Sequence, residues 1–156
     1  NTSTGGYIVT AAAGTAMVGV LNGVTYTDAT TLKPTFSNFY PAATTPANSE
    51  DITAFVNDDP FQEYIIASDA TLGGDLATRK SKIGLTYATT AAAGSTTTGK
   101  SSVQLGISTA ATTAKQLRVV RVAEDPENED QTAANCSLVV KVNLHQYTVG
   151  SLATGI

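Results

Sequence analysis

Short runs of apolar residues separated by polar ones open the chain, and such runs are typical of strands rather than helices. Residues 17–21 are apolar, and the Asn22-Gly23 pair that follows them is the strongest short-range hairpin signal in the sequence. We therefore expect a β-hairpin here, followed by another strand. Phe36 and Tyr40 would share a face of that strand, because side chains repeat every two residues.

Two further apolar runs, residues 52–56 and 61–66, flank the segment Asn57-Asp58-Asp59-Pro60. Acidic residues and the fixed φ of Pro suit a tight turn, so this pattern predicts a second hairpin. The adjacent carboxylates of Asp58 and Asp59 would point in opposite directions on an extended segment. They are therefore a poor general acid–base pair, and a turn is the better interpretation.

Helical spacing is found in one segment, residues 75–82, with Asp75 near a candidate N-terminus and Gly84 as the residue that would end the helix. The later residues 89–98 are rich in Ala, Thr, Gly and Ser and have no apolar face to bury. We expect them to form a loop or arm that is ordered by contact, not a core element.

The last third of the chain has the clearest strand patterns. Val103, Leu105 and Ile107 alternate with polar residues, as on a half-buried strand. Residues 117–123 and 138–144 are rich in Val and are separated by an acidic, Pro-containing connection. They predict a long-looped antiparallel pair that closes a barrel or a sandwich.

These patterns predict one domain over residues 1–156 of the all-β class: an antiparallel β-barrel or β-sandwich with at most one short helix and long Thr/Ala-rich loops. Composition supports this class. About one residue in six is Thr, which packs well on a pleated surface and loses rotamer freedom in a helix. No apolar run approaches the roughly 20 residues that cross a bilayer, so we expect a soluble protein.

Charge and composition argue against several classes of function. The chain has 9 Lys and Arg against 13 Asp and Glu, so its net charge is −4 and it offers no basic patch to nucleic acid or an anionic membrane. One Cys rules out a disulfide framework within the chain and a thiolate zinc site. One His and no Trp leave little material for His-based catalysis or a tryptophan platform for sugars. We expect no enzyme activity, cofactor or metal.

Residues 94–101 read Gly-Ser-Thr-Thr-Thr-Gly-Lys-Ser and satisfy the P-loop pattern in full. A true P-loop follows a buried parallel strand and opens a helix, whose N-terminus supplies the anion site. Here residues 88–93 contain no β-branched apolar run, and the residues after the motif alternate with the period of a strand. We expect Lys100 to bind no phosphate, and a P-loop nucleotide-binding protein is a disfavoured alternative.

The remaining reactive residues have simpler structural interpretations. His145 lies on an expected strand, where a single His is more often a hydrogen-bonded structural residue than a ligand or base. Cys136 precedes an apolar strand and is interpreted as a small buried hydrophobe. An acidic cluster could hold a divalent cation, but it lacks the spacing of a calcium loop and is better interpreted as a solvated hairpin loop. Its members are Glu124, Asp125, Glu127, Glu129 and Asp130.

With chemistry largely excluded, an ordered series of segments becomes the main evidence. The chain reads VGVLNGVTYTD at residues 18–28, PTFSNFYPA at 34–42, DITAFV at 51–56 and DDP at 58–60. It continues with GSTTTG at 94–99, SVQL at 102–105, QLR at 116–118 and VNLHQY at 142–147. In the order and spacing of these segments the chain resembles the head decoration (cement) proteins of tailed bacteriophages, those of short-tailed phages in particular.

This resemblance implies a non-enzymatic, β-rich virion protein on the outer surface of the phage head. There it would bind the major capsid protein, stabilise contacts between neighbouring capsid subunits and assemble as a homotrimer. Members of the family carry additional residues before the segment that residues 6–9 match, which leaves the number of strands open.

An alternative class is a carbohydrate-binding β-sandwich on a virion or cell surface, with aromatic side chains stacked on sugar rings. The candidates for that stacking are Tyr26, Phe39, Tyr40 and Tyr64. The lack of Trp counts against this class, and a role in the core is the stronger interpretation of these aromatic residues.

Overall fold

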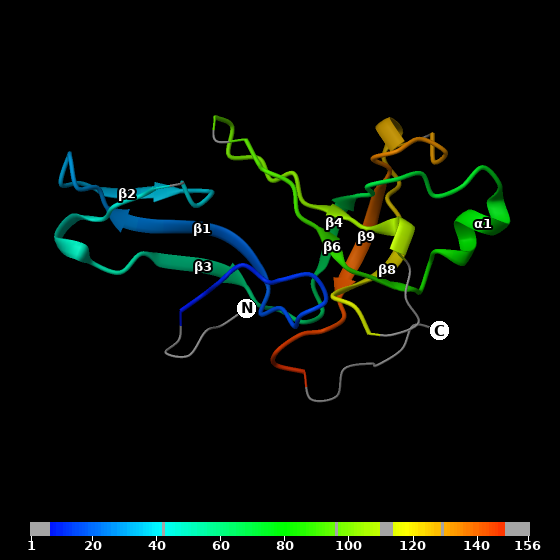
Figure 1. Cartoon of the computed structure of the whole chain (residues 1–156), viewed down its shortest axis with the longest axis horizontal. Coiled ribbons are helices and arrows are strands. Elements are labelled where there is room, and N and C mark those ends of the chain that lie inside the picture. The colour runs from blue at the N-terminus through cyan, green and yellow to red at the C-terminus, as the bar shows by residue number, and fades with distance from the viewer. Residues whose placement is uncertain (1–6, 42, 96, 110–113, 129, 149–156) are drawn as a thin grey trace.

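The computed structural model describes residues 7–41, 43–95, 97–109, 114–128 and 130–148. Its strands form three antiparallel sheets with the orders β2-β1-β3, β4-β9-β8-β5 and β6-β7. Figure 1 shows an elongated molecule with the three-stranded sheet at one end and the four-stranded sheet toward the other. The strands are β1 (Val20–Thr27), β2 (Pro34–Ser37), β3 (Thr53–Asn57), β4 (Glu63–Ala67), β5 (Thr86–Tyr87), β6 (Thr89–Thr90), β7 (Gln104–Leu105), β8 (Leu117–Val122) and β9 (Ser137–Val142). The helical elements are α1 (Leu76–Ser81) and the 3-10 turns η1 (Ala47–Ser49), η2 (Ile107–Thr109) and η3 (Pro126–Asn128).

The hydrophobic core lies against one face of the four-stranded sheet. β8 and β9 pair antiparallel, so the prediction of a Val-rich pair with a long connection is confirmed. Leu105 of β7 and Ile107 of η2 pack on the same cluster, so the β6–β7 ribbon covers this face. The buried members of the cluster are Leu72, Tyr87, Leu105, Ile107, Leu117, Val119, Cys136, Leu138, Val140 and Val142.

A buried glutamine ties three segments to this core. The side chain of Gln116 is fully buried, and its Oε1 accepts hydrogen bonds from the amide and the hydroxyl of Thr89, at 3.0 and 3.1 Å. Its Nε2 donates to the carbonyl of Ala12 at 3.0 Å. The main-chain carbonyl of Gln116 accepts the amides of Asn143 and Leu144. Gln116 therefore joins the start of β6, the N-terminal segment and the end of β9.

The predicted hairpin turn at Asn22-Gly23 is wrong. Both residues lie inside β1, which pairs with β3 and has a register shift between Leu21 and Gly23. The hairpin is made by β1 and β2 instead, and its turn spans residues 28–33. Gly23 thus lies at a β-bulge, a use of glycine in strands that competes with the hairpin signal.

The predicted second hairpin is also wrong, although its turn is present. β3 pairs with β1 and β4 pairs with β9, so residues 58–62 connect two different sheets. Asp59 organises this turn, because its carboxylate accepts the amide of Phe61 at 2.8 Å and its carbonyl accepts the amide of Gln62 at 3.3 Å. The interpretation of Asp59 as a turn residue is confirmed.

The short helix forms where the sequence predicts it. α1 begins after Asp75, whose carboxylate accepts the hydroxyl of Thr78 at 2.6 Å and its amide at 2.9 Å. These bonds, the hydroxyl first, lower the pKa of the Asp75 carboxyl. Gly84 follows the end of the helix with a φ of 85°, a conformation that favours glycine.

The Thr-rich arm extends from the four-stranded sheet toward the three-stranded one. β6 and β7 pair at its base, and the strand expected over residues 103–107 is shorter than predicted, because it ends at Leu105 and is followed by η2. Near the tip, Gly99 lies against the ring of Phe39, which follows β2. The arm therefore contacts the segment that follows β2.

The predicted all-β class, with antiparallel sheets and one short α-helix, is confirmed. Within the described residues, β5 leads into β6 after one residue, and Ser68, which follows β4, forms a parallel bridge with Leu105 of β7. The four-stranded sheet and the β6–β7 ribbon therefore surround the core in a barrel-like arrangement, within the predicted range of a barrel or a sandwich. No helix in the described part of the chain is long and apolar enough to cross a membrane.

Candidate functional site

One face of the three-stranded sheet carries two exposed phenylalanine rings. Phe36 of β2 pairs with Thr25, and Phe55 of β3 pairs with Gly23, so both rings flank the middle of β1. Their centroids are 6.1 Å apart. Phe36 is 64% exposed and Phe55 is 46% exposed. We call this surface the open face, and its residues are Gly23, Thr25, Thr27, Pro34, Phe36, Thr53 and Phe55.

Gly23 allows the Phe36 ring to lie directly over β1. A Cβ at residue 23 would lie 2.7 Å from the ring of Phe36 and 2.9 Å from the carbonyl oxygen of Ser37, which is closer than real side chains approach. This arrangement was not predicted from the sequence. The signal that could have found it is a glycine inside a strand pattern, which marks a bulge or a close approach.

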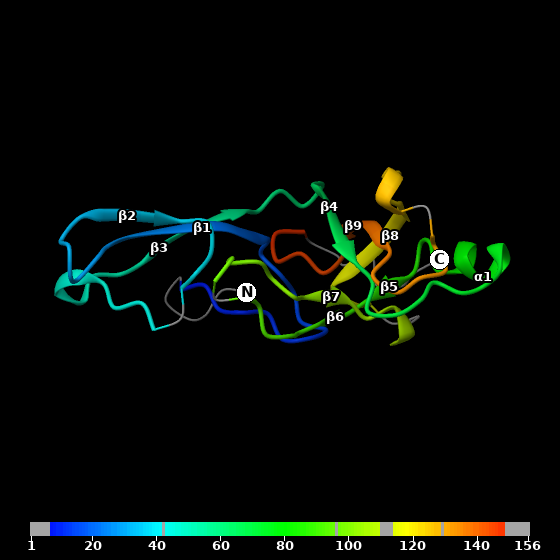
Figure 2. The ribbon, with the colours of Figure 1, turned by 90° about the horizontal axis from the view of Figure 1, so that it is seen from above.

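The opposite face of the same sheet is covered. Val24 alternates with the open-face residues along β1 and is only 2% exposed. Figure 2 shows the segment after β2 and the arm passing on this side of the sheet, whereas no described segment passes over the other side. The three-stranded sheet is therefore a single layer with one packed face and one bare face.

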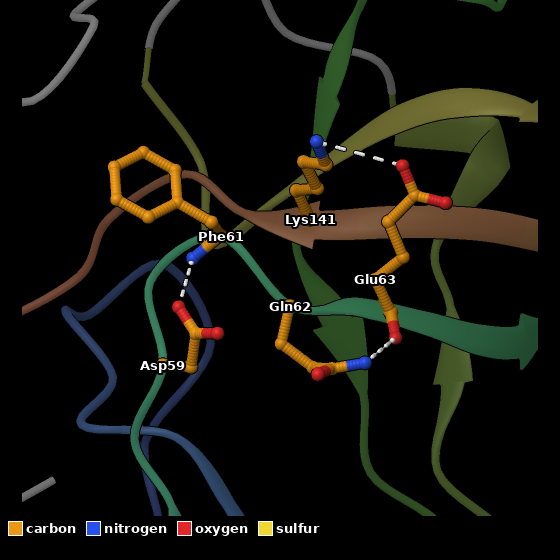
Figure 3. Close-up of polar contacts among 5 residues, drawn as sticks. All are labelled: Asp59, Phe61, Gln62, Glu63 and Lys141. Atoms are coloured by element: carbon orange, nitrogen blue, oxygen red, sulfur yellow. Dashed lines mark hydrogen bonds and ion pairs between the residues drawn. The ribbon is translucent and has the colours of Figure 1, made fainter.

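A second pair of exposed apolar side chains lies where the two larger sheets meet. Phe61 is 77% exposed and Ile65 is 71% exposed. Figure 3 shows the ring of Phe61 projecting from the turn that Asp59 organises, while Glu63 forms an ion pair with Lys141 of β9 at 3.5 Å. The turn thus places an exposed aromatic side chain at the connection between the two larger sheets.

The P-loop look-alike adopts the geometry of a hairpin arm. The amide of Ser95 donates to the carbonyl of Lys100, and the amide of Gly99 donates to the carbonyl of Ser95, both at 2.9 Å. The segment leads into β7 and not into a helix. A phosphate cradle needs backbone amides that converge on the anion, and these two amides are engaged within the turn.

His145 and Cys136 occupy structural positions. β9 ends at Val142, so His145 lies beyond the strand on which it was expected. It is 5% exposed, and its Nδ1 accepts the amide of Tyr147 at 3.1 Å. Its Nε2 is buried without a hydrogen-bond partner among the described residues, so neither nitrogen can act on a molecule from solvent. Cys136 is buried as expected, and burial raises the pKa of its thiol.

The acidic connection between β8 and β9 is a hydrogen-bonded loop. Asn128 fastens it, because its Nδ2 donates to the carbonyl of Ser137 at 3.0 Å and its Oδ1 accepts the amide of Ser137 at 2.8 Å. The carboxylates of Asp125 and Asp130 accept amides of their own turns, and Glu129 lies outside the described residues. Across the described ranges, no three His, Cys, Asp or Glu residues gather in a way that could hold a metal ion.

The four aromatic candidates for sugar stacking are dispersed. Phe39 contacts Gly99 of the arm, and Tyr64 packs against the core of the four-stranded sheet. Tyr40 lies after β2 and is 54% exposed. Tyr26, near the end of β1, lines a hollow in the surface.

Comparison with protein-family models, curated proteins and solved structures finds no match. The fold and the surface therefore assign the chain only to a broad structural class. It is an all-β protein with an uncovered sheet face that carries two aromatic rings, and its described residues contain no assembled catalytic group.

Proposed function

We propose that this chain is a non-enzymatic structural protein of a virion, a decoration (cement) protein on the outer surface of a tailed-phage head. It binds the major capsid protein, stabilises contacts between neighbouring capsid subunits and assembles as a homotrimer. The observation that carries the proposal is the open face. The ordered resemblance to phage decoration proteins supplies the identity of the partner.

A single-layer sheet with two adjacent exposed aromatic rings gains free energy when a partner covers it. Isolated exposed apolar side chains are normal on a protein surface, but Phe36 and Phe55 contact each other on one face. Covering them removes apolar surface from water, which contributes roughly 25 cal/mol per Å². A capsid subunit placed on the open face would supply the layer that the three-stranded sheet lacks.

The chemistry of the open face favours shape and apolar contact over charge. Its residues are Gly, Thr, Pro and Phe, none of which is charged, in a chain whose net charge is −4. β2 and β3 are also the free edges of this sheet, so each can pair with a strand of another subunit. We therefore expect attachment that moderate salt does not remove, because screening acts on charges.

The test uses phage particles prepared from a deletion of this gene. Purified chain is added to the undecorated heads, and binding is measured by co-sedimentation. Phe36→Ser and Phe55→Ser should each weaken binding about tenfold, because covering most of a Phe side chain contributes roughly 1–2 kcal/mol. Leu32→Ser is the matched control, since Leu32 is 69% exposed but lies in the β1–β2 turn outside the open face.

Cryo-EM of decorated particles then gives the location and the oligomeric state. Density outside the shell at threefold or quasi-threefold positions supports the proposal. Absence of binding to the undecorated heads, or density only inside the head or in the tail, rejects it. Equal loss of binding in Leu32→Ser and Phe36→Ser contradicts the role of the open face.

A further inference from the structure

A hollow of about 310 Å³ lies at the end of β1. Figure 1 shows this end of β1 far from the four-stranded sheet. One wall is the end of β1, with Tyr26 and Asp28, and the other is the segment after β2, with Thr44 and Thr45. A β-bridge between Asp28 and Pro46 holds the two walls together. This volume is at the lower end of the range for small-molecule pockets, which suits one ring-sized ligand.

Asp28 presents a fixed carboxylate to the hollow. Its Oδ1 accepts the amide of Thr31 at 2.7 Å, the hydroxyl of Thr31 at 3.0 Å and the amide of Thr30 at 2.9 Å. The bonds from Thr31 above all lower the pKa of this carboxyl, so it is ionised at neutral pH. Within the described residues its Oδ2 makes no hydrogen bond and remains available to a ligand.

Hydroxyl groups and one aromatic ring make up most of the remaining lining. Thr30, Thr44 and Thr45 line the hollow beside Tyr26. The hydroxyl of Thr44 donates to the carbonyl of Pro41 at 2.7 Å, so its oxygen can act toward a ligand only as an acceptor. A half-buried tyrosine offers an apolar ring face and a polar hydroxyl in the same side chain.

We propose that the hollow between Tyr26, Asp28 and Thr45 binds a neutral saccharide unit. A sugar ring has hydroxyls that donate to the free carboxylate oxygen, oxygens that accept from threonine hydroxyls, and an apolar C–H face for the tyrosine ring. A calcium ion suits the site less well, because it takes 6–8 oxygen ligands and the lining supplies a single carboxylate. The ligand chemistry therefore follows from the combination of groups and not from any one of them.

The hollow and the open face lie on opposite sides of the three-stranded sheet. Tyr26 follows Thr25 along β1, and successive side chains point to opposite faces. A chain bound to a shell through its open face would keep the hollow accessible. Saccharide binding is therefore a separate activity from shell attachment, and the two can be tested independently.

The experiment uses the intact chain and two probes: an array of immobilised glycans, and saturation-transfer NMR with free glucose, galactose, mannose and N-acetylglucosamine. Asp28→Asn keeps an oxygen for the turn amides but replaces the free carboxylate oxygen, and should weaken saccharide binding at least tenfold. Thr45→Val removes one hydroxyl from an exposed position and should weaken it several-fold. Asp125→Asn is the matched control, because Asp125 makes a similar turn beside the other sheet, and should bind like the parent chain.

The proposal is supported if the parent chain binds a saccharide, if Asp28→Asn and Thr45→Val bind it more weakly, and if Asp125→Asn binds it like the parent. It is overturned if no glycan on the array and no free sugar binds, or if all three variants bind equally. It is also overturned if the hollow binds Ca²⁺ alone and EDTA abolishes the sugar signal, since the site would then be a cation site. Asp28→Asn should still co-sediment with undecorated heads, so failure here is distinguishable from failure of the proposed function.

Discussion

The contact between the arm and the three-stranded sheet can be tested by placing one methyl group at Gly99. A Cβ there would lie 2.6 Å from Cε1 and 2.7 Å from Cγ of Phe39, and closer still to Cδ1. Gly99 also has a φ of 68°, which L residues adopt at a cost. Gly99→Ala therefore destabilises the fold in two ways: it strains the backbone at residue 99, and it displaces the ring of Phe39.

The two contributions have separate magnitudes. An Ala at positive φ costs about 1 kcal/mol relative to Gly. Burying a whole Phe side chain contributes at most about 3 kcal/mol, and Phe39 is half-buried, so losing its contact with the arm costs about 1.5 kcal/mol. We expect Gly99→Ala to lower the free energy of unfolding by about 2.5 kcal/mol in the parent chain but by about 1 kcal/mol in a Phe39→Ala background.

The assay is urea unfolding of the four chains of this double-mutant cycle, together with hydrogen exchange of the arm amides. Gly84→Ala is the control for the backbone contribution, because Gly84 has a φ of 85° and nothing within 4 Å of an added Cβ. It should cost about 1 kcal/mol alone. An equal effect of Gly99→Ala in the parent and Phe39→Ala backgrounds would refute the contact between the arm and the ring.

Two further outcomes are expected. Gln116→Leu should lower the free energy of unfolding by about 1–3 kcal/mol, because it leaves the partly buried amide of Thr89 without its partner, whereas the carbonyl of Ala12 keeps its bonds from Thr15. A stability within about 0.5 kcal/mol of the parent, roughly the scatter of neutral surface changes, would contradict this. Thermal unfolding should also show an acid-labile contribution from Asp75. The folded-state pKa of Asp75 lies below 3.8, so its stabilisation is complete above the unfolded-state pKa and is lost as pH falls through the folded value. Asp75→Asn should therefore lose less stability than the parent chain as the pH falls. If stability depends on pH in the same way in both chains, the carboxylate of Asp75 is not the cause of the acid-dependent loss.

The elements that the sequence predicted correctly are those set by local chemistry. α1 follows from a capping aspartate and helical spacing within one short segment. β8 and β9 follow from two Val-rich runs on either side of an acidic connection. In each case the residues that predict the element are the residues that form it.

The errors lie where a local signal was consistent with two structures and a distant segment decided between them. Asn22-Gly23 suits a hairpin turn, but it also suits a bulge under a ring, and Phe36 and Phe55 from two other strands select the bulge. The hollow at Tyr26 also depends on a distant segment, because its second wall is formed by residues that follow β2 and are joined to β1 by one bridge. For this reason it was not predicted from the sequence. Neighbouring strands usually pair, and the connection at residues 58–62 departs from that tendency because β4 buries its apolar face against β9.

The two ends of the molecule differ in how they are stabilised, and this difference bears on the proposed function. The buried cluster draws its residues from position 72 onward, so the four-stranded sheet has a core of its own. The three-stranded sheet has Val24 and Gly23 as its only buried residues in β1, β2 and β3, and it depends on the arm at Phe39 on one side. A ligand that binds only the folded form raises stability by mass action, by an amount that its concentration and affinity set. Shell binding through the open face would therefore complete the weaker sheet. Decoration and folding of that sheet would then be one coupled equilibrium, in which each bound chain resists unfolding while it links capsid subunits.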